Sequence, residues 1–239
     1  REIDAGRDPE RKDNDIFSLT QASAALFAMQ QYRDFLAREG DTGGVDYWAS
    51  MIGAGVRSRS QVIDFFFASP EFQGVIAPVA RLYFAYFRRI PDYDGLQFWF
   101  GYSRAGHSLE AISDLFAGSP EFGMTYGGLD NAAFVSLVYQ NILGRAPDVN
   151  GFAYWNGRLD SGAMTRGQLM AAFSESPEYR TRTYSDVYVT MTYAAMLRRA
   201  PDPAGFAFRV GYLDAGNSGL ALVDGFLGSA EYRARFLPD

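Results

Sequence analysis

One short phrase occurs four times in this chain, and it constrains the fold more than any other feature. Its clearest form is LGRAPDVNGFAYW at residues 143–155. The other three read LAREGDTGGVDYW at 36–48, FRRIPDYDGLQFW at 87–99 and LRRAPDPAGFAFR at 197–209. A glycine in the phrase recurs at intervals of 51, 56 and 54 residues. This period predicts one supersecondary unit used four times, which we number copies 1 to 4 in chain order.

The residues around each phrase predict three helices and a short turn. Before the phrase, apolar residues follow the spacing i, i+3, i+4, i+7, i+8, which is one face of a helix. A Pro or Gly then ends this helix, and the Asp that follows can cap the second. The second helix is expected to end at a left-handed glycine: Gly55, Gly106, Gly162 and Gly216. The third is expected to begin at a capping hydroxyl residue: Ser58, Ser108, Thr165 and Ser218.

Units of this size usually stack, because each buries an apolar face that its neighbour completes. The sequence therefore predicts an all-α fold: four stacked three-helix repeats of about 50–57 residues in one continuous array of about twelve helices. The expected boundaries are a charged N-terminal leader at 1–16 and repeats at 17–72, 73–122, 123–179 and 180–239.

Composition excludes several functions. The net charge of -6 and the lack of a Lys/Arg block argue against nucleic-acid binding. No apolar run approaches the roughly 18 residues of a membrane span. The chain has no Cys and one His, His107, so disulfides, thiolate zinc sites and most hydrolytic machinery are excluded, and we expect no enzyme. The first residues are charged where a signal peptide would be hydrophobic, so either the chain is cytosolic or its export signal lies outside it.

The acidic residues after each Pro allow two interpretations. As oxygen ligands spaced by two on a turn, they suit calcium; the candidates are Asp92, Asp94, Asp148 and Asn150. As residues before a helix, they suit N-caps. No Glu stands at the closing position of a twelve-residue calcium loop, so we expect caps, with no cofactor and no metal.

Two further residue types recur at fixed positions. Arg and Glu can form a bidentate pair in every copy that fixes the turn to the third helix; these are Arg38, Arg89, Arg145 and Arg199 with Glu71, Glu121, Glu178 and Glu231. The phrase ends in Trp48, Trp99 and Trp155, which suit either the core or a sugar-stacking platform. Arg209 replaces the fourth Trp, which predicts a position that is at least half exposed.

The pattern LGRAPDxxGxxYW, followed about twenty residues later by SPEY, resembles the bacterial domain of unknown function family 4214, in tandem copies over nearly the whole chain. That resemblance implies an exported surface or matrix component rather than an enzyme. The pattern is also similar to the lipopolysaccharide-anchoring domain of an alphaproteobacterial S-layer protein and, in LGRAP and SPEYR, to phycobilisome linker domains. The family has no agreed catalytic residues to carry over.

We therefore expect a secreted or cell-surface structural or adhesion protein that binds polysaccharide or lipopolysaccharide, or assembles with copies of itself or with other surface proteins. A concave groove lined by aromatic and acidic side chains would be the binding surface. The alternatives are an assembly linker similar to phycobilisome linkers and a polysaccharide-active enzyme. Self-assembly would use the leader, whose alternating Arg, Asp and Glu could dock on the tail of the next molecule.

Overall fold

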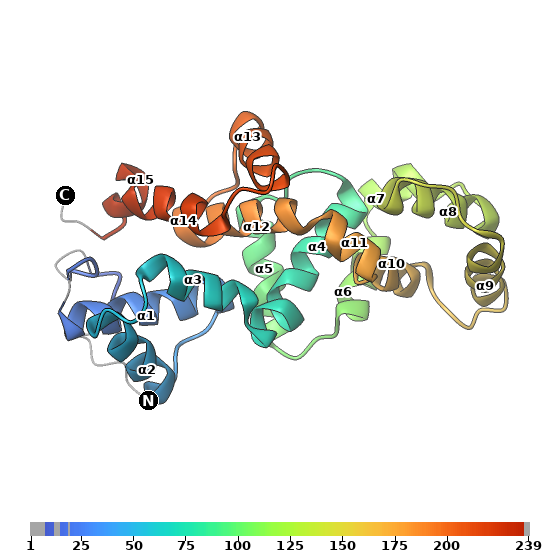
Figure 1. Cartoon of the computed structure of the whole chain (residues 1–239). Coiled ribbons are helices and arrows are strands. Elements are labelled where there is room, and N and C mark those ends of the chain that lie inside the picture. The colour runs from blue at the N-terminus through green and yellow to red at the C-terminus, as the bar shows by residue number, and fades with distance from the viewer. Residues whose placement is uncertain (1–7, 12–14, 19, 237–239) are drawn as a thin grey trace. The chain divides into compact units, whose positions relative to one another are not determined.

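The structure is a computed structural model that describes residues 8–11, 15–18 and 20–236 of the chain. All regular structure in these ranges is helical, with fifteen α-helices, three π-helical turns and no strand (Figure 1). The predicted all-α class is confirmed. Within the same ranges, no helix has the length and the apolar character needed to cross a membrane.

The helices follow the order that the sequence pattern predicts. The first helices are α1(Gln21–Leu36), α4(Ala77–Phe87), α8(Asn131–Val138) with the π-helical η3(Tyr139–Leu143), and α12(Tyr184–Thr192) with η4(Tyr193–Leu197). The second helices are α2(Thr42–Gly53), α5(Tyr93–Arg104), α9(Val149–Asp160) and α13(Pro203–Asp214). The third are α3(Arg59–Ala68), α6(Leu109–Ala117), α10(Arg166–Ser174) and α14(Gly219–Gly228). Each copy closes with a short element: η2(Phe72–Ile76), α7(Pro120–Tyr126), α11(Pro177–Arg182) and α15(Ala230–Ala234).

The predicted helix ends are present. Ser58, Ser108 and Thr165 each accept a hydrogen bond from the backbone N–H three residues on, while Ser218 stands at the N-cap of α14 without such a bond. The glycines after the second helices all have positive φ: Gly55, Gly106, Gly162 and Gly216. These ends are local chemistry, which is why sequence patterns locate them.

A second left-handed position, just before the repeated Arg, escaped the sequence analysis. Copy 3 has Gly144 there, with φ of 69°, but the other copies hold Ala37, Arg88 and Arg198 at φ of 51°, 51° and 54°. A residue with a Cβ pays about 1–2 kcal/mol for this conformation, so the surrounding turn must impose it.

The chain divides into two compact units. Unit 1 comprises the described residues of Arg1–Gly74 and Tyr188–Asp239, and unit 2 comprises Val75–Val187. In unit 1, α1 packs against α2 and α3, and α3 packs against α14. In unit 2, α4 and α6 both pack against α10. Each unit therefore joins the third helices of two copies.

The pairing in unit 1 differs from a stack in chain order, because copy 1 packs against copy 4. The third helices have similar apolar faces: α3 buries Val62 and Phe66, and α14 buries Leu222 and Phe226 at the same positions. Since every copy presents the same kind of face, periodicity alone does not specify which two copies pair. The continuous array of four copies stays a prediction.

In unit 2, a buried polar network joins three helices. The hydroxyl of Tyr86 on α4 donates to the backbone oxygen of Ser113 on α6 at 2.7 Å, and the hydroxyl of Ser113 donates to the backbone oxygen of Gly167 on α10 at 2.6 Å. Arg81 on α4 forms a bidentate ion pair with Glu175, at 2.6 and 2.7 Å. Buried groups with satisfied hydrogen bonds of this kind fix one packing of the helices.

In unit 1, the charged leader binds its own chain. Asp8 accepts a hydrogen bond from Arg33 on α1 at 2.7 Å, and Glu10 pairs with Arg198, which follows η4. The predicted docking of the leader on another molecule is not tested, and residues 1–7 and 12–14 of the leader lie outside the described residues.

The first helix and the last helical segment also meet in unit 1. Asp34 on α1 is almost completely buried and accepts a hydrogen bond from Arg235 at 2.9 Å. Burial raises the pKa of Asp34, and the charge of Arg235 opposes this rise. The ring of Phe17 lies edge-on to Tyr232 and Phe236, at 6.1 and 5.9 Å between centroids. Ionic and aromatic contacts thus hold segments that are distant in the sequence together.

Candidate functional site

The repeated phrase folds into the turn between the first and second helices, and its Asp caps the second helix in all four copies. The Oδ1 atoms of Asp92 and Asp148 accept hydrogen bonds from Gly95 N and Gly151 N at 2.7 and 2.8 Å, and Asp41 and Asp202 do the same. These bonds hold the pKa of Asp148 below its ordinary value. The carboxylates are thus satisfied by backbone N–H groups at a helix N-terminus.

The glycine shared by the four copies makes room for a tyrosine hydroxyl. A glycine in the first turn of a helix can let another backbone approach closely, but the neighbour here is a side chain. A Cβ at Gly205 would lie 2.7 Å from the hydroxyl oxygen of Tyr193, and a Cβ at Gly151 would lie still closer to that of Tyr139. The same contact joins Gly44 to Tyr32 and Gly95 to Tyr83. The glycine therefore fixes the first helix against the second through a side chain.

The repeated Arg and Glu form an ion pair in every copy. Their Nε–Oε1 distances are 2.6 Å for Arg38–Glu71, 3.3 Å for Arg89–Glu121, 2.8 Å for Arg145–Glu178 and 2.6 Å for Arg199–Glu231. Each pair is bidentate, and each joins the turn to the segment that follows the third helix. The guanidinium of Arg145 holds the pKa of Glu178 below its ordinary value. The Glu178 carboxylate is therefore an ionised partner of Arg145 at neutral pH.

The three Trp side chains are half-buried and cover the third helix of their own copy. The ring centroids of Trp99 and Phe116 are 4.9 Å apart, and those of Trp155 and Phe173 are 5.3 Å apart. Trp48 contacts Phe66 at 6.0 Å in the same way, and also Phe65 at 5.4 Å. Each Trp thus packs on the core and is also partly exposed, which lies between the core and platform interpretations.

The aromatic residue just before each Trp is the exposed one, and sequence reasoning missed it. On α5, Leu96 and Phe100 are buried, whereas Phe98 between them is 61% exposed. Each residue turns a helix by about 100°, so Phe98 lies on the face opposite the core and Trp99 at its border. The equivalent residues are also more than half exposed: Tyr47, Tyr154 and Phe208. Helical geometry applied to the buried positions would have identified them.

In copy 4, Arg209 takes the place of the indole. Its Cζ atom lies 5.2 Å from the ring centroid of Tyr193 and 5.0 Å from that of Phe226, the residues that correspond to Tyr139 and Phe173 of copy 3. Burial raises the pKa of Tyr193, and the charge of Arg209 opposes this rise. Arg209 is less than half exposed, so the exposure that its replacement of Trp predicted is wrong: its guanidinium lies over the two rings, where the indole lies in the other copies.

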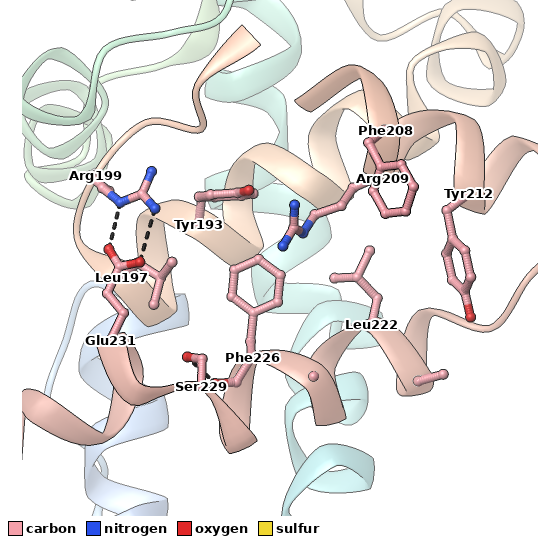
Figure 2. A pocket seen from close by; sticks show the side chains of 12 residues that line it. Tyr193, Leu197, Arg199, Phe208, Arg209, Tyr212, Leu222, Phe226, Ser229 and Glu231 are labelled. Atoms are coloured by element: carbon pink, nitrogen blue, oxygen red, sulfur yellow. Dashed lines mark hydrogen bonds and ion pairs between the residues drawn. The ribbon is translucent and has the colours of Figure 1, made fainter. Parts of the chain in front are cut away.

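A pocket of about 380 Å³ lies beside Arg209 and is formed entirely by copy 4 (Figure 2). It is lined by residues of η4, α13, α14 and α15, among them Phe208, Tyr212, Gly225 and Glu231. Figure 2 shows the Arg209 side chain reaching from α13 toward the rings of Tyr193 and Phe226. The pocket combines aromatic walls, one guanidinium and one Arg–Glu ion pair.

Comparison with known protein families identifies this chain. The family model described as Domain of unknown function (DUF4214) matches residues 14–76, 113–183 and 178–236. These segments together cover most of the sequence. The chain belongs to the DUF4214 family. Searches of the curated proteins and of the solved structures find no match.

The DUF4214 matches place the phrase of copies 1, 3 and 4 within the family pattern. The phrase of copy 2, at residues 87–99, lies outside the matched segments, although its fold elements and its Arg–Glu pair are the same. The tandem occurrence of DUF4214 segments, which the sequence predicted, is confirmed.

The DUF4214 turns do not gather ligands for a metal. Asp92 and Asp148 are occupied as caps, and Asp94 and Asn150 lie in the first turn of the helix that each cap begins. Throughout the described ranges, no three His, Asp or Glu side chains lie where they could hold an ion together. The single histidine, His107, is exposed and stacks on Tyr102 at 3.7 Å.

Proposed function

We propose that this chain is a non-enzymatic structural or adhesion protein of the cell surface or extracellular matrix that binds polysaccharide or lipopolysaccharide. In this proposal the four copies are repeats of one three-helix unit that form a continuous array, and each repeat presents the same small binding face. One observation carries the proposal. An exposed aromatic ring stands beside the repeated turn in every copy: Tyr47, Phe98, Tyr154 and Phe208.

Exposed aromatic rings suit sugars for a physical reason. One face of a pyranose ring presents C–H groups, which pack on a flat apolar surface, while its hydroxyl groups stay in water. A single ring contributes little affinity, but repeated sites on one molecule act together on a repeating polymer. A repeated weak site therefore matches the repeated chemistry of a polysaccharide.

The arrangement of acids supports a non-enzymatic role. Glycosidic cleavage uses two carboxyl groups on either side of the bond. The carboxylates of the repeated Glu residues are each bound by an Arg, and those of the repeated Asp residues cap helices. A repeated motif also offers the same acid several times rather than two acids with different environments, which such catalysis needs.

Assembly with copies of this chain or with other surface proteins is the second part of the proposal. The exposed aromatic residues would serve there as contacts between proteins. A scaffold role similar to that of phycobilisome linkers would use the same surfaces without a sugar. These roles are separated by what the exposed rings bind.

A glycan array, followed by calorimetry on the sugars that bind, tests the proposal. Changing the exposed rings to serine, in the combined variant Tyr47→Ser, Phe98→Ser, Tyr154→Ser and Phe208→Ser, is expected to abolish binding and leave the fold intact. The control changes two other exposed apolar residues, Met124→Ser and Val149→Ser, which are 82% and 85% exposed.

Three results would contradict the sugar-binding role. First, the wild-type chain could bind no glycan. Second, the control variant could lose binding as much as the ring variant. Third, light scattering could show that the wild-type chain self-associates and the ring variant does not, with no glycan bound by either. The third result would leave the assembly role as the function.

A further inference from the structure

Two residue changes open the pocket in copy 4. In copy 1 the corresponding space holds two aromatic rings, Trp48 and Phe65, whose centroids are 5.4 Å apart. Copy 4 has Arg209 in place of the first and Gly225 in place of the second. A Cβ added at Gly225 would have no neighbour within 4 Å, so this side of the pocket is open. Copy 4 thus keeps the rings of Tyr193 and Phe226, which correspond to rings in the other copies, and has an open space beside them. We call these two rings the platform.

We propose that this pocket binds a single anionic sugar residue, a uronic acid of an acidic polysaccharide, with Arg209 holding its carboxylate. This inference rests on the proposed sugar-binding function and names the class of sugar that copy 4 selects. The pocket volume of about 380 Å³ falls within the range of small-ligand sites, about 300–1,000 Å³.

The guanidinium of Arg209 has unused hydrogen-bond donors. Its Cζ atom lies over two aromatic rings, and one N–H makes a long bond of 3.4 Å to the backbone oxygen of Gly205. None of the carboxylates in the described ranges forms an ion pair with it. Because cation–π contacts use none of the N–H groups, donors of Arg209 stay available for the bidentate bond that guanidinium makes with carboxylate.

Among the charged residues that line the pocket, Arg209 is the cation without an ion-pair partner. Arg199 and Glu231 bind each other through two hydrogen bonds of 2.6 and 3.0 Å. In Figure 2, this pair lies on the far side of Tyr193 from Arg209. The pair is neutral, so the pocket carries the single positive charge of Arg209 although the whole chain has a net charge of -6. An anion is therefore favoured here, although the net charge of the whole chain is negative.

Aromatic side chains supply the second half of the site. Phe208, which is 72% exposed, and Tyr212 both come from α13 and line the pocket with Arg209. Figure 2 shows both rings on the same side of the pocket as Arg209. A sugar that stacks on such a ring while its carboxylate reaches the guanidinium satisfies both groups. A neutral sugar uses only the ring.

Calorimetry with tetragalacturonate and with its fully methyl-esterified form tests this inference, because the two sugars differ only in the carboxylates. The free acid is expected to bind at least about tenfold more tightly than the ester. The variants Arg209→Gln and Arg209→Trp should lose about tenfold in affinity for the acid, the second also because it restores the ring found in the other copies. The control Arg57→Gln removes an exposed arginine that lies 5.1 Å from the ring of Phe65, and should leave the affinity unchanged.

Four outcomes overturn the inference. The acid and the ester could bind equally, the Arg209→Gln variant could keep its affinity, or Arg57→Gln could lose affinity equally. An octapeptide that ends in a phenylalanine carboxylate, which offers a carboxylate without a sugar, could also bind more tightly than the acid. Circular dichroism of each variant checks its fold. If neutral glycans bind through the exposed rings while Arg209 has no effect, the proposed function stands and this inference fails. If the wild-type chain binds no glycan at all, the proposed function itself fails.

Discussion

Copies 3 and 4 share one frame and differ in what covers it. Both hold a tyrosine against the glycine of the turn, an Arg–Glu pair and a phenylalanine on the third helix. Copy 3 places the indole of Trp155 over Phe173, and copy 4 places Arg209 over Phe226. The tyrosine, the glycine, the Arg–Glu pair and the phenylalanine, which we call the frame, thus keep the same arrangement under either an indole or a guanidinium. The residue at the position of Trp155 and Arg209 can therefore change with function, while the frame residues maintain the fold.

The largest expected effect tests the frame itself. Gly151→Ala in copy 3 would press a Cβ against the hydroxyl of Tyr139, and we expect it to lower the free energy of unfolding by about 2 kcal/mol. Without that contact, alanine would instead stabilise this helix by up to about 1 kcal/mol. Urea unfolding gives the sign directly. Gly205→Ala in copy 4 should cost less, because the hydroxyl of Tyr193 is farther away.

Removing the tyrosine hydroxyl supplies the control. In a Tyr139→Phe background, Gly151→Ala should lose most of its cost, because the nearest atom that the new methyl group meets is gone and only the Asp148 carboxylate, with Oδ2 at 2.9 Å, remains close. A stabilising Gly151→Ala, or an equal cost in the Tyr139→Phe background, would mean that the hydroxyl does not set the spacing of the helices.

Exchanging the covering residues has a smaller expected effect. Trp155→Arg gives copy 3 the residue of copy 4 and should cost about 1–2 kcal/mol, because a half-buried indole loses its contact with Phe173. Arg209→Trp should be neutral or stabilising by up to about 1 kcal/mol, since the platform and the vacant space both accept a ring. Thermal and urea unfolding measure both. A strong destabilisation by Arg209→Trp would show that the frames of the two copies differ.

The smallest effect concerns pH and should be alike in the two copies. Arg199 holds the pKa of Glu231 below its ordinary value of 4.5, and Arg145 does the same for Glu178. Each pair therefore adds stability that is complete above pH 4.5 and is lost as the pH falls through the lowered pKa. Glu231→Gln and Glu178→Gln should each cost a little stability at pH 7 and nothing in strong acid. Unfolding curves at both pH values that differ between the two variants would separate the copies.

Much of the fold was predictable because it is set by neighbours in the sequence. The Asp caps, the hydroxyl caps and the left-handed glycines are contacts over a few residues, and each leaves a residue type that can be recognised. The left-handed Ala37 leaves none, because the surrounding turn imposes its conformation on an ordinary side chain. The pairing of α3 with α14 was also hidden, since similar apolar faces do not encode a choice of partner.

The candidate site was predictable only in part, for a geometric reason. The Trp residues drew attention by their chemistry, yet the exposed ring is the one before each Trp, and that requires knowing which side of the helix is buried. The pocket depends on Gly225 and Arg209 being adjacent in space, sixteen residues apart in the chain. Only the replacement of Trp at Arg209 indicated that copy 4 is different.

The bond between Asp34 and Arg235 has a consequence for the order in which this protein is made. The two residues are 201 positions apart, so the carboxylate has no such partner until the 201 residues that follow it have been synthesised. Unit 2 is continuous in sequence from Val75 to Val187 and can fold as soon as its own residues have emerged. In unit 1, α1 can pack against α2 and α3 at once, but the face of α3 that packs against α14 stays uncovered until copy 4 has been made. Synthesis that stalls in copy 4 therefore leaves this face of α3 exposed to chaperones and proteases.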